Sequence, residues 1–184
     1  MARSTTVTAL AALLLTSAVV RADPANPLTD LVDAAAQRLQ VAEPVAAAKW
    51  HTGGAIEDPA RVRGQLAGLA ADATAEHLDP EYVTQVFADQ IAATEALEYR
   101  RFADWKLDPS EVPADPPSLT ESRAAIDNFN RAMVAQIGQQ WQLLHSPECA
   151  GRLEAASRDV SAARRLDDLY QHALSVATQS YCRP

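Results

Sequence analysis

The sequence predicts an all-α protein, built as a helical bundle of five to six helices. Apolar residues recur at intervals of three and four over most of the chain, which is the spacing of one helix face. Glycine is scarce, at 6 of 184 residues, and the 11 prolines cluster between the periodic stretches, where helices begin and end. Together these observations favour helices over strands.

The first 22 residues have the layout of a secretory signal peptide. Arg3 precedes an apolar run over residues 7–20, and small residues around Ala22 offer a cleavage point before Asp23. The run is too short to cross a membrane as a helix. We expect export with cleavage after Ala22, which leaves residues 23–184 as one domain; an uncleaved N-terminal anchor is the alternative.

Three helices are expected in the first half of the mature chain. The first is periodic on both sides of a kink at Pro44 and ends at a pair of glycines. Each of the next two starts with an Asp-Pro pair, in which the aspartate caps the helix and the proline is its first residue. The expected ranges are residues 28–51, 59–77 and 80–105.

A proline-rich linker separates these helices from the second half. Residues 107–117 contain four prolines, which predicts an extended and stiff segment. Ser118 and Glu121 then form a capping box for a helix that ends near residue 144. Pro147 interrupts, and the chain is expected to be helical from there to about residue 181.

Cys149 and Cys182 favour a disulfide once the chain is exported, with two free thiols as the alternative. A straight helix between them would be about 50 Å long, whereas bonded cysteines need Cα atoms within about 7 Å. Either the segment bends back, with residues 157–161 as the expected bend, or the bond joins two chains. We favour the internal bond, which would fasten the C-terminus to the rest of the domain.

The overall charge restricts the partners. The chain carries 24 acidic and 16 basic side chains, and loss of the leader removes two arginines and no acid. A surface of this sign repels nucleic acid and anionic membranes, so we expect neither as a partner after signal cleavage. The four histidines are scattered and no metal-binding motif occurs, so we expect no metal site.

Charged residues interrupt the apolar inner faces of the predicted helices. On the first helix, Arg38 and Lys49 lie eleven residues apart, which returns to nearly the same face three turns later. A buried charge is costly unless a partner or a ligand compensates it. The alternative for each cation is that its alkyl stem packs inward while its charge reaches water.

The next two helices repeat this pattern. The second helix opens with polar residues at helical spacing, namely Asp58, Arg61 and Gln65. For Asp58, N-capping of the helix is favoured over ligand binding. For Arg61, the alternative to ligand binding is a surface ion pair with Asp58. On the third helix, Thr94 and Glu98 lie one turn apart between bulky apolar residues. Either they face a ligand, or Thr94 bonds to its own helix and Glu98 joins an internal salt bridge.

Arg123 lies in the first turn of the helix that follows the linker. A cation there opposes the helix dipole, so local stability does not account for it. Four helices that each direct polar groups inward predict a pocket. Because the pocket would hold several cations and one or two carboxyls, it predicts a small dianionic ligand.

These residues resemble the active-site pattern of the all-α (AroQ-class) chorismate mutases. The intervals between the six residues from Arg38 to Glu98 match as a set, and the resemblance covers nearly the whole mature chain. It implies the type II chorismate mutase fold, with the active site mainly in residues 30–125 and the C-terminal helices as scaffold. Segments similar to the secreted gamma subclass found in mycobacteria are AAAKW (46–50), IED (56–58), DQIAATEALEY (89–99) and ATQSYC (177–182).

The family implies an isomerase that converts chorismate into prephenate by a pericyclic (Claisen) rearrangement, with no cofactor and no covalent intermediate. Such an enzyme holds a compact conformer of a dianion and stabilises the negative charge that develops on its ether oxygen. By resemblance, the catalytic residues are Lys49, Glu98 and Arg61, and the substrate-binding set adds Arg38, Asp58, Gln65, Thr94 and Arg123.

The resemblance also implies individual roles. The arginines at 38, 61 and 123 would bind carboxylate groups of the substrate, and Lys49 would donate to the ether oxygen. Glu98 faces the same oxygen, so it should be protonated when it acts, because a carboxylate would repel the developing charge. Thr94 would bond a substrate carboxylate, while Asp58 and Gln65 would contact the substrate hydroxyl or orient Arg61.

Arg123 would complete the site within one chain, whereas shorter members of the family take an arginine from the partner subunit. We therefore expect one complete site per chain. The subclass forms homodimers, and the resemblance implies a homodimer here.

Two other functions are compatible with the residues. One is a secreted helical protein that binds a small dicarboxylate without turnover; Lys49 and Glu98 argue against it, because a binder needs no donor aimed at an ether oxygen. The other is an interaction protein that meets a host or envelope partner, which leaves the inward cations unexplained. The sequence favours an enzyme that is secreted or periplasmic.

Overall fold

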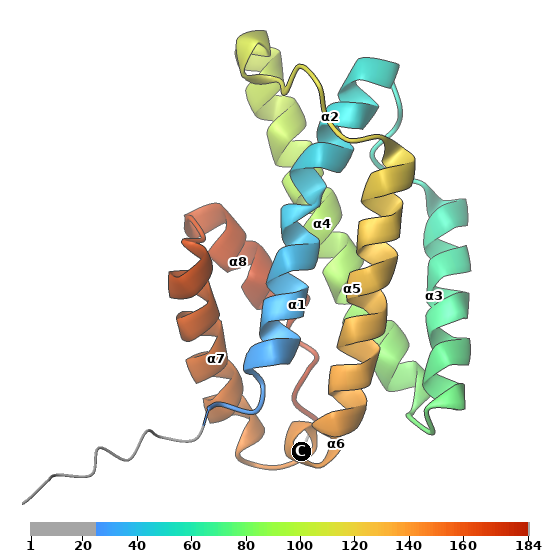
Figure 1. Cartoon of the computed structure of the whole chain (residues 1–184), viewed down its shortest axis with the longest axis vertical. Coiled ribbons are helices and arrows are strands. Elements are labelled where there is room, and N and C mark those ends of the chain that lie inside the picture. Colours follow the sequence, from blue (N-terminus) through green and yellow to red (C-terminus); the bar gives the residue numbers. More distant parts are fainter. Residues whose placement is uncertain (1–24, 184) are drawn as a thin grey trace, which may run out of the picture.

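Helices make up the secondary structure of residues 25–183, the part of the chain that the computed structural model describes (Figure 1). This confirms the all-α class. The expected leader, residues 1–22, lies outside the described residues. The elements are α1 (Thr29–Gln40), α2 (Ala42–Thr52), α3 (Pro59–Ala75), α4 (Pro80–Leu107), the 3₁₀ helix η1 (Pro109–Glu111), α5 (Leu119–Gln139), α6 (Trp141–Leu144), α7 (Cys149–Arg164) and α8 (Asp168–Ala177).

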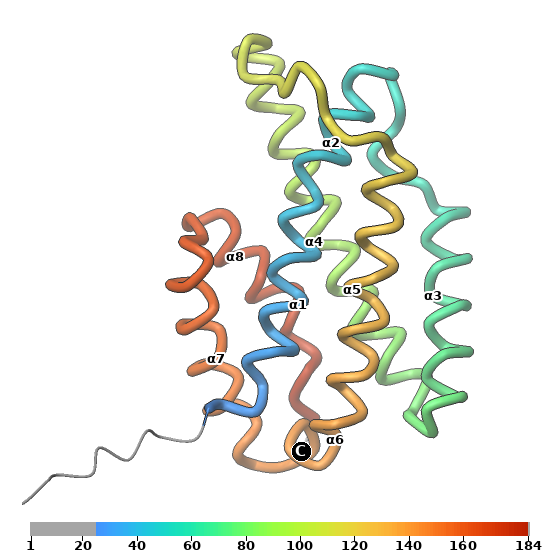
Figure 2. Tube along the Cα trace, in the orientation of Figure 1, coloured from blue at the N-terminus to red at the C-terminus, as the bar shows by residue number. Residues whose placement is uncertain are grey.

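The long helix α4 runs through the middle of the bundle. It packs against α2, α3 and α8, while α1 packs against α5, α7 and α8. Helices α7 and α8 lie on the opposite side of the bundle from α3 (Figure 1). The last residues return to the foot of the bundle beside α6, where the Arg183 N–H donates to the Leu144 carbonyl at 3.0 Å (Figure 2).

The helix starts predicted from capping residues are confirmed. Asp58 and Asp79 each accept a backbone N–H from the first turn of the helix that follows, at 3.0 and 2.9 Å. Ser118 and Glu121 form both bonds of a capping box at the start of α5. These caps satisfy N–H groups that have no partner within the helix, which is why the helices begin there.

Two of the expected helices are broken, and this raises the number of helices above the expected five to six. Residues 28–51 divide at Val41, three residues before the predicted kink at Pro44. Because Pro44 has no N–H to donate to the carbonyl of Gln40, the regular bonding fails one turn upstream of the proline. The helix predicted to reach residue 144 likewise ends at Gln139, and α6 follows as a separate turn.

The C-terminal segment bends back, as the internal disulfide requires, but the predicted place of the bend was wrong. Helix α7 continues through residues 157–161 and ends at Arg164; the next residue, Arg165, has a left-handed backbone with φ 52°. Asp167 then caps α8 by accepting the Tyr170 N–H at 2.8 Å. Serine does not break a helix, whereas a left-handed residue followed by an N-cap does.

The disulfide itself is confirmed as a bond within the chain. It joins Cys149, the first residue of α7, to Cys182 beyond α8, with the two Cα atoms 5.6 Å apart. It therefore closes a loop that contains both C-terminal helices.

The apolar core fills the space between α1, α4, α5, α7 and α8. Helix α3 is buried only near its C-terminal end, at Leu69 and Ala73, so its N-terminal half remains beside open space. No helix within residues 25–183 is long and apolar enough to span a membrane.

Candidate active site

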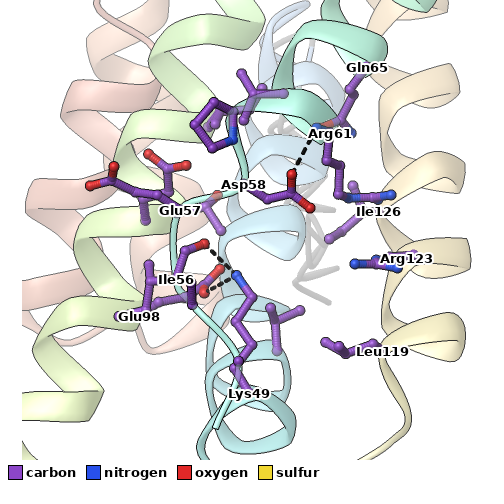
Figure 3. A pocket seen from close by; sticks show the side chains of 18 of the residues that line it. Lys49, Ile56, Glu57, Asp58, Arg61, Gln65, Glu98, Leu119, Arg123 and Ile126 are labelled. Atoms are coloured by element: carbon purple, nitrogen blue, oxygen red, sulfur yellow. Dashed lines mark hydrogen bonds and ion pairs between the residues drawn. The ribbon is translucent and has the colours of Figure 1, made fainter. Parts of the chain in front are cut away.

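All the residues that the sequence predicts for the site line one cavity of about 400 Å³. The cavity lies between the first five helices, and Figure 3 shows its polar side chains converging from several of them. The predicted residues in its wall are Arg38 from α1, Lys49 from α2, Asp58, Arg61 and Gln65 at the start of α3, Thr94 and Glu98 from α4, and Arg123 from α5.

Arg38 is a buried cation with neutral partners. Its side chain does not reach water, since the residue is 2 % exposed. Nε donates to Oδ1 of Asn130 at 2.8 Å, and Nη1 donates to Oγ1 of Thr94 at 3.2 Å. Burial lowers the pKa of Arg38 to about 10, so the guanidinium stays charged at neutral pH. A charge held in this way is a ready partner for an anionic ligand.

Lys49 is fixed between α4 and the loop that follows α2. Its Nζ donates to Oε2 of Glu98 and to the carbonyl of Ile56, both at 2.7 Å (Figure 3). The ammonium has three N–H donors, so one remains after these two bonds. The internal salt bridge considered for Glu98 is present in this structure, and it lies in the wall of the cavity.

Two carboxyl groups of the cavity have altered acidity. Burial raises the pKa of Glu98, and the hydrogen bond and charge of Lys49 offset part of that rise. Burial also raises the pKa of Glu95, with a further contribution from the negative charge of Glu57. Both carboxyls therefore take up a proton more readily than exposed ones.

The start of α3 contributes hydrogen-bond donors to the wall of the cavity. Asp58 caps the helix through the Arg61 backbone N–H, as one of its two expected roles requires. The Arg61 side chain forms no salt bridge with Asp58 in the described part of the chain, so the alternative of a surface pair is not observed. Nε2 of Gln65 is buried and has no hydrogen-bond partner within residues 25–183. The guanidinium of Arg123 points toward the same space from α5 (Figure 3).

Thr94 uses its hydroxyl within the protein. Oγ1 donates to the carbonyl of Gln90 at 2.8 Å and accepts from Arg38. The back-bonded alternative for Thr94 is therefore present. Because the Thr94 hydroxyl donates to the Gln90 carbonyl, its oxygen is oriented to accept from Arg38 and so positions that side chain. Donation to a ligand would require the hydroxyl to rotate.

The cavity combines cationic donors with apolar walls. Its four cations come from four helices, and its apolar lining includes Val45, Ile91, Leu119 and Ile126. Charge-assisted bonds in a partly dry site hold anions more strongly than bonds in water. The arrangement can bind a small dianion and fix its conformation. Among residues 25–183, no group of three or more His, Cys, Asp or Glu side chains could hold a metal ion.

Two groups at the site were not predicted from the sequence. Asn130 lies on the inward stripe of α5, seven residues after Arg123, so its periodicity is a signal that could have revealed it. The Ile56 carbonyl, which accepts from Lys49, belongs to the backbone of the loop between α2 and α3. A backbone acceptor in an irregular segment leaves no signal in residue types.

The amino-acid sequence of this chain is similar to those of known proteins. Residues 29–99 match the family model described as "Chorismate mutase type II". The chain is 56 % identical over 165 residues to the secreted chorismate mutase of Mycobacterium tuberculosis, covering 90 % of this chain and 83 % of that protein. It is 54 % identical over 162 residues to the secreted chorismate mutase of Mycolicibacterium smegmatis, covering 88 % and 90 %.

Solved structures agree with the sequence comparison. The fold is similar to a chorismate mutase from Burkholderia phymatum, with a TM-score of 0.81 and 27 % identity over 86 % of this chain and 98 % of that one. It is also similar to a chorismate mutase from Burkholderia thailandensis, with a TM-score of 0.80 and 34 % identity over 85 % and 99 %.

Proposed function

Because this chain belongs to the chorismate mutase type II family, we propose that it rearranges chorismate to prephenate in the cavity that the five helices α1 to α5 line. The chain is an intramolecular isomerase by its close homology to the two secreted relatives. The observation that carries the proposal is the convergence of four cations from four helices on one cavity of about 400 Å³. The positive sign of that set is complementary to a small dianion.

The three arginines bind the two carboxylates of the substrate. Arg38 contributes a fixed guanidinium from the floor of the cavity, while Arg61 and Arg123 approach from α3 and α5. Arginine suits this task because its planar fork matches both oxygens of a carboxylate. Binding two carboxylates from different sides restricts the flexible substrate to the compact conformer that reacts.

Lys49 and Glu98 act on the ether oxygen, where negative charge develops as the C–O bond breaks. The third N–H of Lys49 donates to that oxygen or to a carboxylate beside it. Glu98 donates to the same oxygen in its protonated form, which its burial favours. A substrate carboxylate beside Lys49 raises the pKa of Glu98 further, so binding promotes the protonated form. Catalysis then consists of placed donors and a restricted conformer.

The remaining polar residues orient substrate or other side chains. Gln65 has a buried amide nitrogen that is without a partner in the described part of the chain, which suits donation to the substrate. Asp58 holds the first turn of α3 and with it the Arg61 backbone. Thr94 supports Arg38 and reaches a carboxylate after its hydroxyl rotates. This mechanism uses no cofactor.

The chain is secreted, as its two mycobacterial relatives are. The disulfide between Cys149 and Cys182 suits the oxidising environment outside the cytoplasm. Cleavage after Ala22 is part of this proposal.

Two copies associate as a homodimer in this proposal. Two large apolar side chains among residues 25–183, Tyr99 and Leu107, are 50 % and 88 % exposed, and both belong to α4. The homodimer is proposed from the resemblance to the secreted subclass, and these two side chains are candidates for its interface. Light scattering on the purified protein would test the association, and a monomer at assay concentration would contradict it.

The activity and the site are tested together by the loss of chorismate absorbance. The purified secreted protein is compared with Arg61→Ala, and the product is identified as prephenate. We expect rapid turnover by the parent and a loss of about a hundred-fold or more in kcat/KM for the variant, because a carboxylate contact disappears. Turnover that survives in the variant would contradict the site. Binding of dicarboxylates by a folded parent without turnover would favour the binding-protein alternative.

A further inference from the structure

The guanidinium of Arg38 is held by an amide where a carboxylate is the usual partner. Buried arginines generally pair with acidic side chains. Here Nε donates to Oδ1 of Asn130 at 2.8 Å, with the two residues 2 % and 5 % exposed. In the part of the chain that the structure describes, Arg38 takes part in no salt bridge, and its other bond goes to the hydroxyl of Thr94. Both of its partners are neutral.

Three N–H groups of the guanidinium have no hydrogen-bond partner among residues 25–183. Arginine has five N–H donors, and Asn130 and Thr94 use one on Nε and one on Nη1. The second N–H of Nη1 and both of Nη2 remain. Two nitrogens side by side form the fork that binds a carboxylate through both of its oxygens. Asn130 accepts from Nε, which is not part of the pair formed by Nη1 and Nη2.

Helix α5 brings Asn130 and Arg123 to the cavity together. The two residues are seven positions apart, which places them two turns apart on one face of the helix. Asp127, on the turn between them, is exposed and forms no salt bridge with Arg38 within residues 25–183. The amide is thus the contact through which α5 holds Arg38, although an acidic residue of the same helix lies nearby.

We propose that Asn130 is a positioning residue for substrate binding, which fixes the direction of the Arg38 guanidinium without compensating its charge. This inference rests on the proposed role of Arg38 in binding a substrate carboxylate. An aspartate in the same place would hold the guanidinium equally well, but its carboxylate would compete with that of the substrate. The choice of amide over carboxylate then determines substrate affinity.

The test compares Asn130→Asp with Asn130→Ala in the full secreted protein, by steady-state kinetics with chorismate and by thermal unfolding. We expect Asn130→Asp to raise KM by about ten-fold or more, with a smaller effect on kcat, because a new ion pair must be broken to bind substrate. Its Tm stays near that of the parent, since the new carboxylate pairs with a charge that is already buried. Asn130→Ala leaves an N–H of Arg38 unpaired, so it lowers Tm more and raises KM less.

Asn128→Asp is the matched control, because it adds the same charge to an exposed position of the same helix. We expect its KM to stay within about two-fold of the parent value, since exposed charges act weakly through water. A similar rise in KM for Asn128→Asp would overturn the inference, as would a larger rise for Asn130→Ala than for Asn130→Asp.

Arg38→Ala separates this inference from the proposed function. If Arg38→Ala raises KM while Asn130→Asp does not, the role of Asn130 is wrong and the proposed site stands. If Arg38→Ala leaves KM unchanged, Arg38 does not bind substrate, and both the proposed role of Arg38 and the inference fail.

Discussion

Arg38 and Lys49 are both buried cations, but their partners prepare them for different tasks. Within residues 25–183, the hydrogen-bond partners of the Arg38 side chain are neutral, so no bonded carboxylate competes with an incoming one. Lys49 is paired with Glu98 at 2.7 Å, so its charge is partly compensated until Glu98 takes up a proton. In the proposed mechanism, the first cation mainly binds substrate and the second acts on the reacting oxygen.

The acidity of Glu98 predicts the pH dependence of the enzyme. Burial raises its pKa, and the protonated form is the one that can donate to the ether oxygen. We therefore expect kcat to fall as pH rises through this raised pKa. Glu98→Gln keeps a neutral donor at every pH, so its kcat profile between about pH 4 and 8 should be flat. A decline in the variant that matches the parent would contradict this role.

Glu95→Gln provides the control for that experiment. Glu95 is the neighbouring carboxyl of the cavity wall, and its pKa is also raised. In the proposed mechanism it gives no proton to the ether oxygen, so Glu95→Gln should retain the decline of kcat with pH. If this variant alone flattened the profile, the titrating group would be Glu95.

Removal of Lys49 should abolish most of the rate without unfolding the protein. We expect Lys49→Ala to lower kcat by about three orders of magnitude, because a charge-assisted donor to the reacting oxygen is lost. Glu98 then loses the partner that lowers its pKa, and it avoids a buried negative charge by taking up a proton. Circular dichroism would verify the fold. Near-parental turnover by a folded variant would remove Lys49 from the mechanism.

At the residue scale, the lining of the cavity was predictable where its groups are side chains on helix faces. Arg38, Lys49 and Glu98 interrupt apolar stripes, and a charge in such a place is costly enough to signal a pocket. Asn130 interrupts a stripe as well, but an uncharged amide gives a weaker signal. The carbonyl of Ile56 gave none, because every residue has one.

At the scale of single helices, the start of α5 controls the position of Arg123. The capping box of Ser118 and Glu121 fixes the turn that leads to Arg123 after an irregular segment. Ser118→Ala should lower the free energy of unfolding by about 1 kcal/mol. It should also raise KM by about three-fold or more, because a frayed first turn no longer holds the arginine at the cavity. Urea denaturation and chorismate kinetics would measure the two effects.

Asp167→Ala is the matched control for this cap. It removes the N-cap of α8, which accepts the Tyr170 N–H at 2.8 Å, and α8 does not line the cavity. We expect a similar loss of stability with KM unchanged. Equal changes of KM in both variants would mean that general stability, and not the position of Arg123, governs substrate binding.

The predicted elements failed where a helix breaks inside a periodic stretch, and in the linker, where the 3₁₀ helix η1 (Pro109–Glu111) replaces part of the segment predicted to be extended. Starts were correct because caps and prolines act through local bonds that residue types reveal. The break at Val41 follows from the missing N–H of Pro44, whereas the break at Gln140 and the bend at Arg165 occur at residues with no breaking character of their own. Packing against helices that are distant in the sequence determines these positions, so local residue types do not reveal them.

At the scale of the whole molecule, the site and the disulfide occupy different parts. The predicted site residues lie between positions 38 and 123, whereas the disulfide closes the segment that holds α7 and α8. In Figure 1 these two helices lie across the bundle from α3, which borders the cavity. The C-terminal helices thus support α1 and α4 from behind and contribute no cavity-lining residue among those described.

Loss of the disulfide should therefore reduce stability more than activity. The double variant Cys149→Ser/Cys182→Ser should lower the free energy of unfolding by about 2–4 kcal/mol, since a loop of this length is no longer closed in the unfolded chain. At 25 °C its kcat and KM should match those of the parent, which chorismate assays would check. A large loss of kcat with the fold retained would show that the C-terminal segment takes part in the reaction.

The turn at residues 165–167 lies between the two bonded cysteines, which has a consequence for the enzyme outside the cell. A protease that cut this turn would produce two peptides still joined through sulfur, with every predicted site residue on the larger one. Such a nicked enzyme would run as one band on a gel without reductant and as two bands with it. Cleavage at this turn would not change the measured activity until a thiol reduced the disulfide.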